Sequence, residues 1–203
     1  MNHAHPAAQL DLEPRFEPRL EPRLEPRLDP RHERGALGLP GGQPLPDRPL
    51  TRTELVDLAR AIAADPDTWA HHVRYSPTRR HFVSLYRDTN VEAWLICWTP
   101  VSDTGWHDHD VSAGAVAVAE GAVVEHSLTL GGPEIPTVAT RGTAYSFGPD
   151  HIHRMTGRDP ESATVHVYSP PLWRMGQYTI SSTGILRRLS VSYADELRPL
   201  EPA

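Results

Sequence analysis

The sequence predicts a mainly β protein, a jelly-roll barrel that follows short N-terminal helices and a disordered tail. Three observations predict this class. The first 49 residues contain a proline-rich repeat, a helical pattern begins near residue 51, and from residue 80 short Val-, Trp-, Tyr- and Ile-rich segments alternate with Gly, Pro and Asp. Many short strands after two helices are typical of a sandwich or barrel. The 203 residues suffice for one domain with a core and a tail.

The tail repeats a four-residue unit between residues 12 and 31, first seen as Leu-Glu-Pro-Arg at 12–15. A proline in every unit removes a helix donor and clashes with the preceding turn. The alternating charges nearly cancel, and one apolar residue in four cannot build a core. We therefore expect a disordered Pro/Arg/Glu repeat tail over 1–49, a folded domain over 50–195 and a C-terminal tail over 196–203.

The helices come first in the expected domain. Thr51 and Glu54 have the spacing of a capping box, in which a hydroxyl and a carboxylate satisfy the first amides of a helix. Apolar residues then recur at helical spacing as far as Ile62. Asp-Pro at 65–66 ends this helix, and we expect a second short helix over 69–73.

The strands share β-branched and aromatic residues and end at Gly, Pro or Asp. A barrel interior or mouth built from such strands is a natural place for a small site. The expected strands cover residues 80–87, 91–99, 106–109, 114–119, 122–130, 144–147, 151–155, 164–169 and 177–181.

Composition argues against several classes of protein. The formal net charge of −6 disfavours nucleic-acid binding. No apolar run is long enough to span a membrane, and Met1–Leu10 lacks the apolar stretch of a secretory signal. Cys97 is the single cysteine, which rules out intrachain disulfides and fits a reducing compartment. We expect a cytoplasmic protein with no nucleic-acid or membrane partner.

Histidines carry the chemistry of this sequence. His107 and His109 are two residues apart in an expected strand, so both side chains point to the same face. His153, from a later strand, would complete a set of three neutral nitrogens, and His151 shares its face and competes for that place. Imidazole suits Fe, Zn, Cu and Ni, so the ligand type does not choose the metal.

The spacing around these histidines resembles the cupin motifs. Residues 105–109, Gly-Trp-His-Asp-His, followed by Gly121 match the first motif, and Gly142 to His153 matches the second. The position of the usual carboxylate ligand is Gly114. A cupin with three histidines and no carboxylate resembles the cysteine dioxygenase family.

Three further motifs are similar to that family. They are Ile-Cys-Trp at 96–98, His-Arg-Met at 153–155 and His-Val-Tyr-Ser-Pro-Pro at 166–171. These three motifs and the His-Asp-His motif at 107–109 fall in the family's order over about residues 50–177. The resemblance therefore identifies residues 50–195 as a cupin thiol dioxygenase domain.

The resemblance implies a non-haem Fe(II) enzyme with His107, His109 and His153 as metal ligands, since the motif selects His153 over His151. It implies that the enzyme oxidises the thiol L-cysteine with O2 to cysteine sulfinic acid. It further implies a role in cysteine catabolism and taurine metabolism, and a monomeric enzyme. Three neutral ligands leave the ion doubly positive and favour a thiolate, and Gly114 keeps coordination space open. A dioxygenase of another thiol acid, such as 3-mercaptopropionate, or a non-catalytic metal-binding cupin are the alternatives.

Thr164, His166 and Tyr168 alternate along one strand and so share a face. They resemble the family's Ser-His-Tyr hydrogen-bonded relay, which implies catalytic roles and places Tyr168 beside the substrate. The alternative is three half-buried strand residues.

Two departures from the family pattern stand out. The cysteine that cross-links to the tyrosine in mammalian members is replaced by Gly114, so we expect no cross-link. The arginine that binds the substrate carboxylate aligns with Ser84. Arg80 has the same strand parity and is our choice for substrate binding, whereas Arg87 has the opposite parity and would need a bulge. We expect Trp98 to be a core residue, and Asp108, which points away from the ligands, to be solvated.

Overall fold

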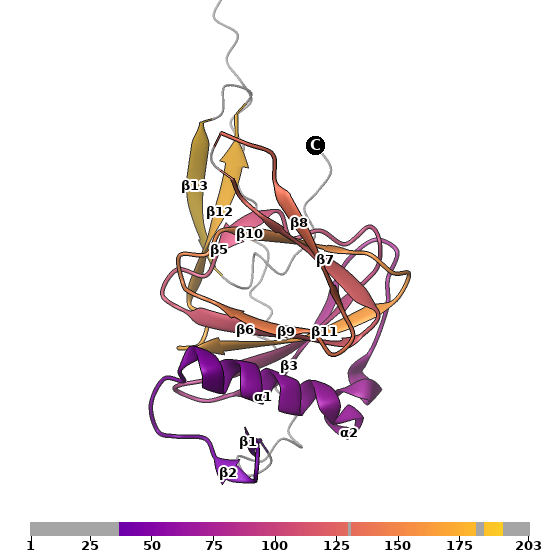
Figure 1. Ribbon diagram of the computed structural model, residues 1–203, viewed down its shortest axis with the longest axis vertical. Helices are drawn as coiled ribbons and strands as arrows, with labels where there is room; N and C mark the ends of the chain where they lie inside the picture. The colour runs from indigo at the N-terminus through magenta and orange to yellow at the C-terminus, as the bar shows by residue number, and fades with distance from the viewer. Residues whose placement is uncertain (1–36, 130, 182–184, 193–203) are drawn as a thin grey trace, which may run out of the picture.

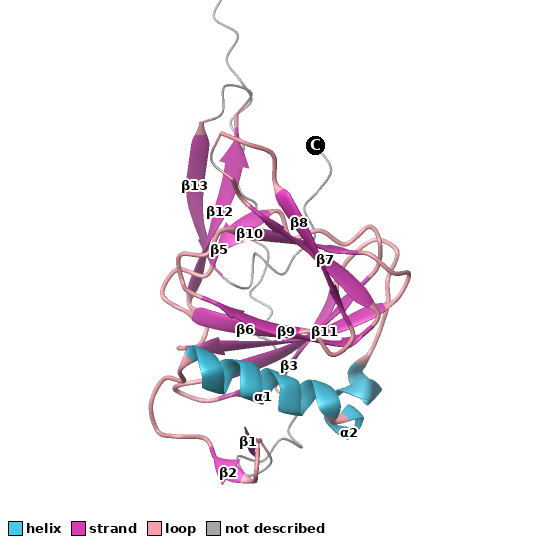
Figure 2. Ribbon diagram, viewed as in Figure 1, coloured by secondary structure: helices cyan, strands magenta, loops and turns pink. Residues whose placement is uncertain are grey.

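Two antiparallel sheets face each other to form a barrel, and helix α1 (Arg52–Ala64) lies across the outer face of one sheet (Figure 1; Figure 2). The computed structural model describes residues 37–129, 131–181 and 185–192. The mainly β class and the jelly-roll architecture are confirmed. No helix among these residues has the length and apolar character needed to cross a bilayer.

Each sheet interleaves strands from distant parts of the sequence. The order is β3-β4-β11-β6-β9 in the sheet under α1 and β13-β12-β5-β10-β7-β8 in the other. The first sheet contains β3 (His81–Arg87), β4 (Glu92–Trp98), β6 (Ala113–Glu120), β9 (Ala144–Phe147) and β11 (Ser162–Ser169). The second contains β5 (Trp106–Asp108), β7 (Ala122–Ser127), β8 (Ile135–Thr140), β10 (His153–Gly157), β12 (Arg174–Ile180) and β13 (Leu186–Ser192).

The segment before α1 differs in part from the expected disorder. Residues 37–49 include the short hairpin β1 (Gly38–Leu39) and β2 (Gln43–Pro44). Leu37, Leu39 and Leu45 pack against the buried cluster beneath α1. Residues 37–49 lack the Glu-Pro-Arg repeat and contain leucines that the domain can bury. Residues 1–36 and 193–203 lie outside the described residues.

The capping box at the start of α1 is confirmed. Thr51 Oγ1 accepts a hydrogen bond from the Glu54 amide at 3.3 Å, and Glu54 Oε2 accepts one from the Thr51 amide at 2.8 Å. The second helix begins earlier than expected, as α2 (Pro66–Trp69) followed by the 3-10 turn η1 (Ala70–His72). Proline suits the first position of a helix because its fixed φ is helical and its missing amide has no partner to lose there.

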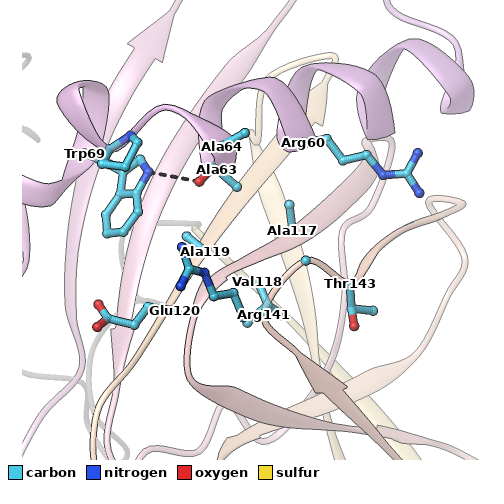
Figure 3. A pocket seen from close by; sticks show the side chains of 12 residues that line it. Arg60, Ala63, Ala64, Trp69, Ala117, Val118, Ala119, Glu120, Arg141 and Thr143 are labelled. Carbon is cyan, nitrogen blue, oxygen red and sulfur yellow. Dashed lines mark hydrogen bonds between the residues drawn. The ribbon is translucent and has the colours of Figure 1, made fainter.

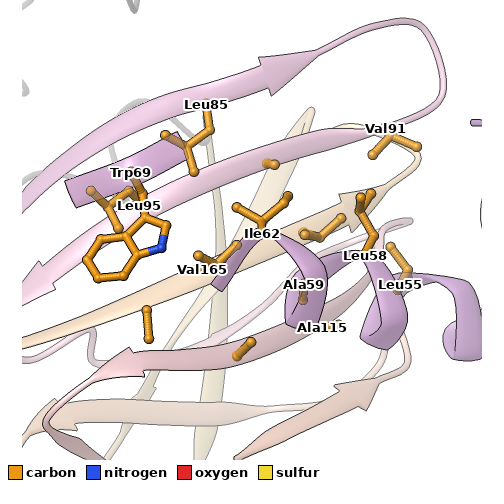
Figure 4. Packing of buried hydrophobic residues seen from close by; sticks show 14 of the residues in the cluster. Leu55, Leu58, Ala59, Ile62, Trp69, Leu85, Val91, Leu95, Ala115 and Val165 are labelled. Carbon is orange, nitrogen blue, oxygen red and sulfur yellow. The ribbon is translucent and has the colours of Figure 1, made fainter. Parts of the chain in front are cut away.

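Two apolar clusters hold the layers together. One lies between α1 and the outer face of the first sheet, where Leu58 and Ile62 meet Leu95 and Val165 (Figure 4). The other fills part of the barrel interior. Strand β4 contributes to both because its alternate side chains point to opposite faces, and all seven of its residues are buried.

Strands β8 and β13 were not expected. β8 pairs with β7 along its whole length. Its apolar side chains are largely exposed, with Ile135 57% and Val138 47% accessible. The strand therefore lacks the repeated buried positions that produce a readable alternation. The same holds for β13, which pairs with β12 and, among the described residues, with no other strand. The expected strand over 122–130 ends at Ser127.

Candidate metal centre

His107 and His153 face each other across two paired strands. They are direct partners in the register of β5 and β10, and their Nε2 atoms are 3.1 Å apart. Imidazole bonds of about 2.1 Å at right angles would place two ligand nitrogens about 3 Å apart. The separation therefore suits two neighbouring ligands of one ion.

His109 completes the group from the residue after β5. Its ring centroid lies 5.0 Å from that of His107 and 5.2 Å from that of His153. One nitrogen from each ring falls within 4.8 Å of the other two, and all three side chains are buried. Neither ring nitrogen of His109 has a hydrogen-bond partner among the described residues. A buried imidazole without a partner is costly, and a metal ion at the shared point would satisfy one of its two nitrogens.

The other two ligands are oriented by their second ring nitrogens. His107 Nδ1 donates to the Gly105 carbonyl at 3.1 Å, and His153 Nδ1 donates to Glu125 Oε1 at 2.8 Å. In both rings this leaves Nε2 unprotonated and directed at the shared point. Such outer partners fix the tautomer of metal-binding histidines. Sequence reasoning missed Glu125, which reaches the site from β7.

His151 binds Glu125 and not the three-histidine group. Its Nε2 donates to the same Oε1 atom at 3.0 Å. Glu125, His151 and His153 are also close enough together to hold a metal ion, but the two hydrogen bonds already explain their proximity. Burial alone would raise the pKa of the Glu125 carboxyl, yet the hydrogen bonds from His151 and His153 outweigh it and lower the pKa to about 2.

Burial keeps the three histidines neutral. It lowers the pKa of His107 and His109 well below 6.5 and also lowers that of His153, although Glu125 opposes the shift at His153. Metal binding requires neutral imidazole. The group is therefore in the right protonation state for a metal ion at neutral pH.

The structure places Thr164, His166 and Tyr168 in one hydrogen-bonded chain. His166 bonds the Tyr168 hydroxyl through Nδ1 at 3.1 Å and Thr164 Oγ1 through Nε2 at 2.8 Å. Trp98 adds a fourth member, because its indole Nε1 donates to Thr164 Oγ1 at 2.7 Å. Trp98 is fully buried, as expected of a core residue, and its hydrogen-bond partner comes from another strand. Burial lowers the pKa of His166 to about 3.

The chain of donors points toward Tyr168. Thr164 accepts from Trp98, and its own proton is directed at His166 Nε2, because the other acceptor in reach, the Ile96 carbonyl, is 3.5 Å away. A neutral His166 that accepts through Nε2 carries its proton on Nδ1 and donates to the Tyr168 oxygen. The Tyr168 and His109 rings are 5.1 Å apart.

The two candidate arginines flank the same strand, since Arg80 precedes β3 and Arg87 is its last residue. Arg80 is 7% exposed, with its guanidinium 5.5 Å from the Trp98 ring. Its charge contributes to lowering the pKa of both His107 and His166. A bulge between Ser84 and Tyr86 shifts the register, so Arg87 falls opposite Glu92 and forms an ion pair at 3.0 Å.

Gly114 lies between Tyr168 and Phe147 on paired strands. A Cβ atom there would lie 2.4 Å from Phe147 Cε2 and 3.0 Å from Tyr168 Cδ1. The space that the missing side chain leaves is therefore taken by the Phe147 ring. Phe147 was not identified from the sequence, because its neighbour across the sheet is set by the pairing of β9 with β6.

Asp108 is not solvated as expected. It is 6% exposed, and its carboxylate accepts hydrogen bonds from Arg188 Nε at 2.8 Å, from the Tyr178 hydroxyl and from the Gly176 amide at 3.0 Å. These partners lie on β12 and β13, which pack beside β5 only in the folded protein. Asp108 thus anchors the segment that holds two of the histidines.

Two cavities lie outside the three-histidine group. One of about 580 Å³ separates the C-terminal half of α1 from β6, with Arg60, Trp69 and Arg141 at its margins (Figure 3). The other, of about 420 Å³, is lined by residues that include Glu125, Phe147 and His151. The second cavity therefore borders the outer side of the histidine group.

A jelly-roll barrel with three converging inner histidines defines a metal-binding cupin. The chain matches the family model for cysteine dioxygenase type I over residues 48–181 and belongs to that family. It is therefore a cupin-type thiol dioxygenase whose histidine group suits a metal cofactor.

Solved structures with distant similarity were also found. A protein with a double-stranded β-helix domain from Klebsiella pneumoniae is 16% identical with a TM-score of 0.44, covering 59% of this chain and 91% of that one. KdgF from a Halomonas species is 16% identical with a TM-score of 0.40, covering 49% and 86%. An RmlC-like cupin from Desulfovibrio desulfuricans is 18% identical with a TM-score of 0.42, covering 49% and 90%. No curated protein sequence matches the chain.

Proposed function

We propose that the protein is a non-haem Fe(II) dioxygenase that converts L-cysteine and O2 to cysteine sulfinic acid. The observation that carries this proposal is a buried group of three neutral histidines with no carboxylate among its members. When bound, Fe(II) supplies a doubly positive centre that favours the thiolate form of the substrate and the redox chemistry with O2. Both oxygen atoms are transferred to sulfur, which is oxidised by four electrons as O2 is reduced by four.

His107, His109 and His153 would hold the iron. Their neutral state matters for the substrate as well as for the metal. A carboxylate ligand would cancel part of the charge of the ion and weaken its preference for an anionic thiolate. The ligand set therefore supports a thiol in preference to a neutral substrate such as a sugar.

Tyr168 is proposed as the catalytic hydroxyl. Its oxygen accepts from His166, so its own proton can be donated to the reacting sulfur or oxygen atoms. The low pKa of His166 keeps that ring neutral, which holds it as an orienting donor rather than as an acid. Thr164 in turn fixes the tautomer of His166.

Arg80 is proposed to bind the substrate carboxylate. Arg80 is buried in the barrel interior, and its positive charge adds to the effect of burial in lowering the pKa of the metal ligand His107 and of His166. Arg87 is less suited because Glu92, which is fully buried, already pairs with its guanidinium. A planar guanidinium offers two parallel donors to a carboxylate.

A dioxygenase of 3-mercaptopropionate is the second candidate. The observation in its favour is the buried Ser84 at the position that aligns with the family's arginine. Both substrates have a thiol and a carboxylate, but only L-cysteine has an amine.

We further propose that the enzyme acts as a cytoplasmic monomer in cysteine catabolism and taurine metabolism.

The decisive experiment reconstitutes the protein anaerobically with Fe(II), and then measures O2 uptake and sulfinate formation with L-cysteine and 3-mercaptopropionate in parallel. Preference for L-cysteine supports the proposal, and preference for 3-mercaptopropionate retains the chemistry but changes the substrate. Absence of uptake with either thiol, on protein shown to contain iron, favours a non-catalytic metal-binding cupin. The His153→Ala variant serves as the control, because it should lose both iron and turnover.

A further inference from the structure

His109 is held differently from the other two histidines of the group. His107 is oriented by the Gly105 carbonyl and His153 by Glu125, each through the second ring nitrogen. Neither nitrogen of His109 has such a partner among the described residues. Metal-binding histidines almost always have one, so some other contact must fix the direction of this ring.

Two aromatic rings supply that contact. The Phe147 ring stacks on His109 with centroids 4.8 Å apart and an angle of 27° between the planes. The Tyr168 ring is 5.1 Å away at 34°. Both separations fall in the range of favourable ring packing. His109 is fully buried and Phe147 is 3% exposed, so the Phe147 ring has little freedom to move.

Cross-strand pairing explains how the two rings reach the same histidine. Gly114 pairs directly with Tyr168 on one side and with Phe147 on the other. Directly paired residues project to the same face of a sheet. The glycine therefore separates the two aromatic residues by one empty position on the inner face, beside His109.

The empty position at residue 114 is what admits the Phe147 ring. A Cβ added to Gly114 would lie 2.4 Å from Cε2 and 2.5 Å from Cζ of Phe147. Real Cβ atoms do not approach other carbons so closely, because repulsion rises steeply below van der Waals contact. Any side chain at 114 would therefore push the Phe147 ring away from its present place against His109.

We propose that Phe147 is a positioning residue for the metal ligand His109, and that residue 114 must be glycine for Phe147 to act in this way. The inference rests on the metal centre of the proposed function, but it requires no particular thiol. Phe147 orients His109 by ring packing, whereas a hydrogen bond orients each of the other two ligands. Gly114 affects the metal indirectly, through Phe147.

A double-mutant cycle on metal affinity tests this coupling. The affinity for Co(II) is measured by competition with a chelator for the wild type, Phe147→Ala, Gly114→Ala and the double variant. The Co(II) absorption spectrum reports the coordination of the ion. We expect each single variant to weaken binding by about 10- to 100-fold, the range seen when outer-shell partners are lost. We expect the double variant to bind no more weakly than Phe147→Ala alone, because the second change acts on a ring that is already absent.

Val123→Ala is the matched control. Val123 is fully buried in the same interior cluster as Phe147 but faces Gly157 on β10 across the sheet. The Val123→Ala substitution removes core volume away from His109, so the Co(II) spectrum and affinity of this variant should match those of the wild type. If Phe147→Ala does not fold, Phe147→Leu replaces it in the cycle, since leucine fills most of the volume without a flat ring.

Unchanged Co(II) affinity and spectrum in a folded Phe147 variant would overturn the proposal. Equal fold-losses for Gly114→Ala in the presence and absence of Phe147 would overturn the coupling. These outcomes are distinct from a failure of the proposed function, which would appear as missing thiol oxidation by iron-loaded wild-type protein whatever the result of the cycle.

Discussion

Glu125 and His153 lie on the neighbouring strands β7 and β10, and Oε1 of Glu125 accepts a hydrogen bond from His153 Nδ1 at 2.8 Å. This contact directs Nε2 of His153 toward His107. The same oxygen accepts from His151 at 3.0 Å. One carboxylate therefore links a metal-binding histidine to a partly exposed one at the edge of the site.

Glu125→Gln should weaken metal binding. The amide oxygen can still accept hydrogen bonds but carries no charge, so it holds the two histidines less firmly. We expect the affinity for Fe(II) or Co(II) to fall by about 10- to 100-fold, as measured by chelator competition. His151→Leu is the comparison, because it removes the second donor and leaves His153 bound to Glu125. An equally large loss in both variants would contradict this assignment.

Tyr168→Phe should slow turnover and leave the metal in place. The change removes the hydroxyl that His166 orients, and a positioned proton donor contributes about 100-fold or more to a rate. We expect kcat to fall by about 100-fold with an unchanged iron content, measured by O2 uptake and metal analysis.

Thr164→Val should slow turnover, but by less than Tyr168→Phe does. It breaks the bonds to Trp98 and His166 and leaves the tautomer of His166 unfixed. Thr164→Ser keeps the hydroxyl and should retain most of the activity. A valine variant as active as the serine variant would remove the relay from the mechanism.

Arg80→Ala should chiefly raise KM. The guanidinium would bind the carboxylate equally in the ground and transition states, so kcat should change little. Hydrogen bonds to charged groups are worth about 1.5–3 kcal/mol, which corresponds to roughly a 10- to 100-fold rise in KM for L-cysteine. Steady-state kinetics across substrate concentrations measure the effect.

Arg87→Ala provides the contrast. It leaves the carboxylate of the fully buried Glu92 with one partner fewer. We expect a loss of roughly 1–3 kcal/mol in the free energy of unfolding, measured by urea denaturation, with KM close to that of the wild type. A large rise in KM here, and none for Arg80→Ala, would move the carboxylate anchor to Arg87.

Glu54→Gln tests the helix cap through its pH dependence. A hydrogen bond from Arg48, with a further one from the Thr51 amide, lowers the pKa of Glu54 to about 2 from 4.5. A carboxyl whose folded-state pKa is depressed stabilises the protein above its unfolded pKa and loses that contribution as pH falls. Glutamine can keep the capping hydrogen bond without the charge. The wild type should thus be the more stable above pH 4.5, and the difference in unfolding free energy should shrink as pH falls toward 2. A difference that does not vary with pH would contradict the charge effect.

Local sequence patterns determined the class of fold and the histidines to consider. The cap at Thr51 and Glu54 involves residues three apart, so sequence alone can predict it. The two-residue spacing of His107 and His109, and of Thr164, His166 and Tyr168, predicts shared faces because side chains alternate along a strand. The structure brings each of these sets together.

Register across strands was decided only by the tertiary structure. The bulge after Ser84 turns Arg87 inward, which its parity in the sequence did not predict. Glu125, Trp98 and Phe147 reach the site because their strands pair with neighbours that are distant in the sequence. Periodicity reports which face a side chain takes, whereas the packed barrel determines which side chain lies opposite it. The sequence therefore determined the fold class and the residue types of the site, and the assembled sheets decided which partners orient them.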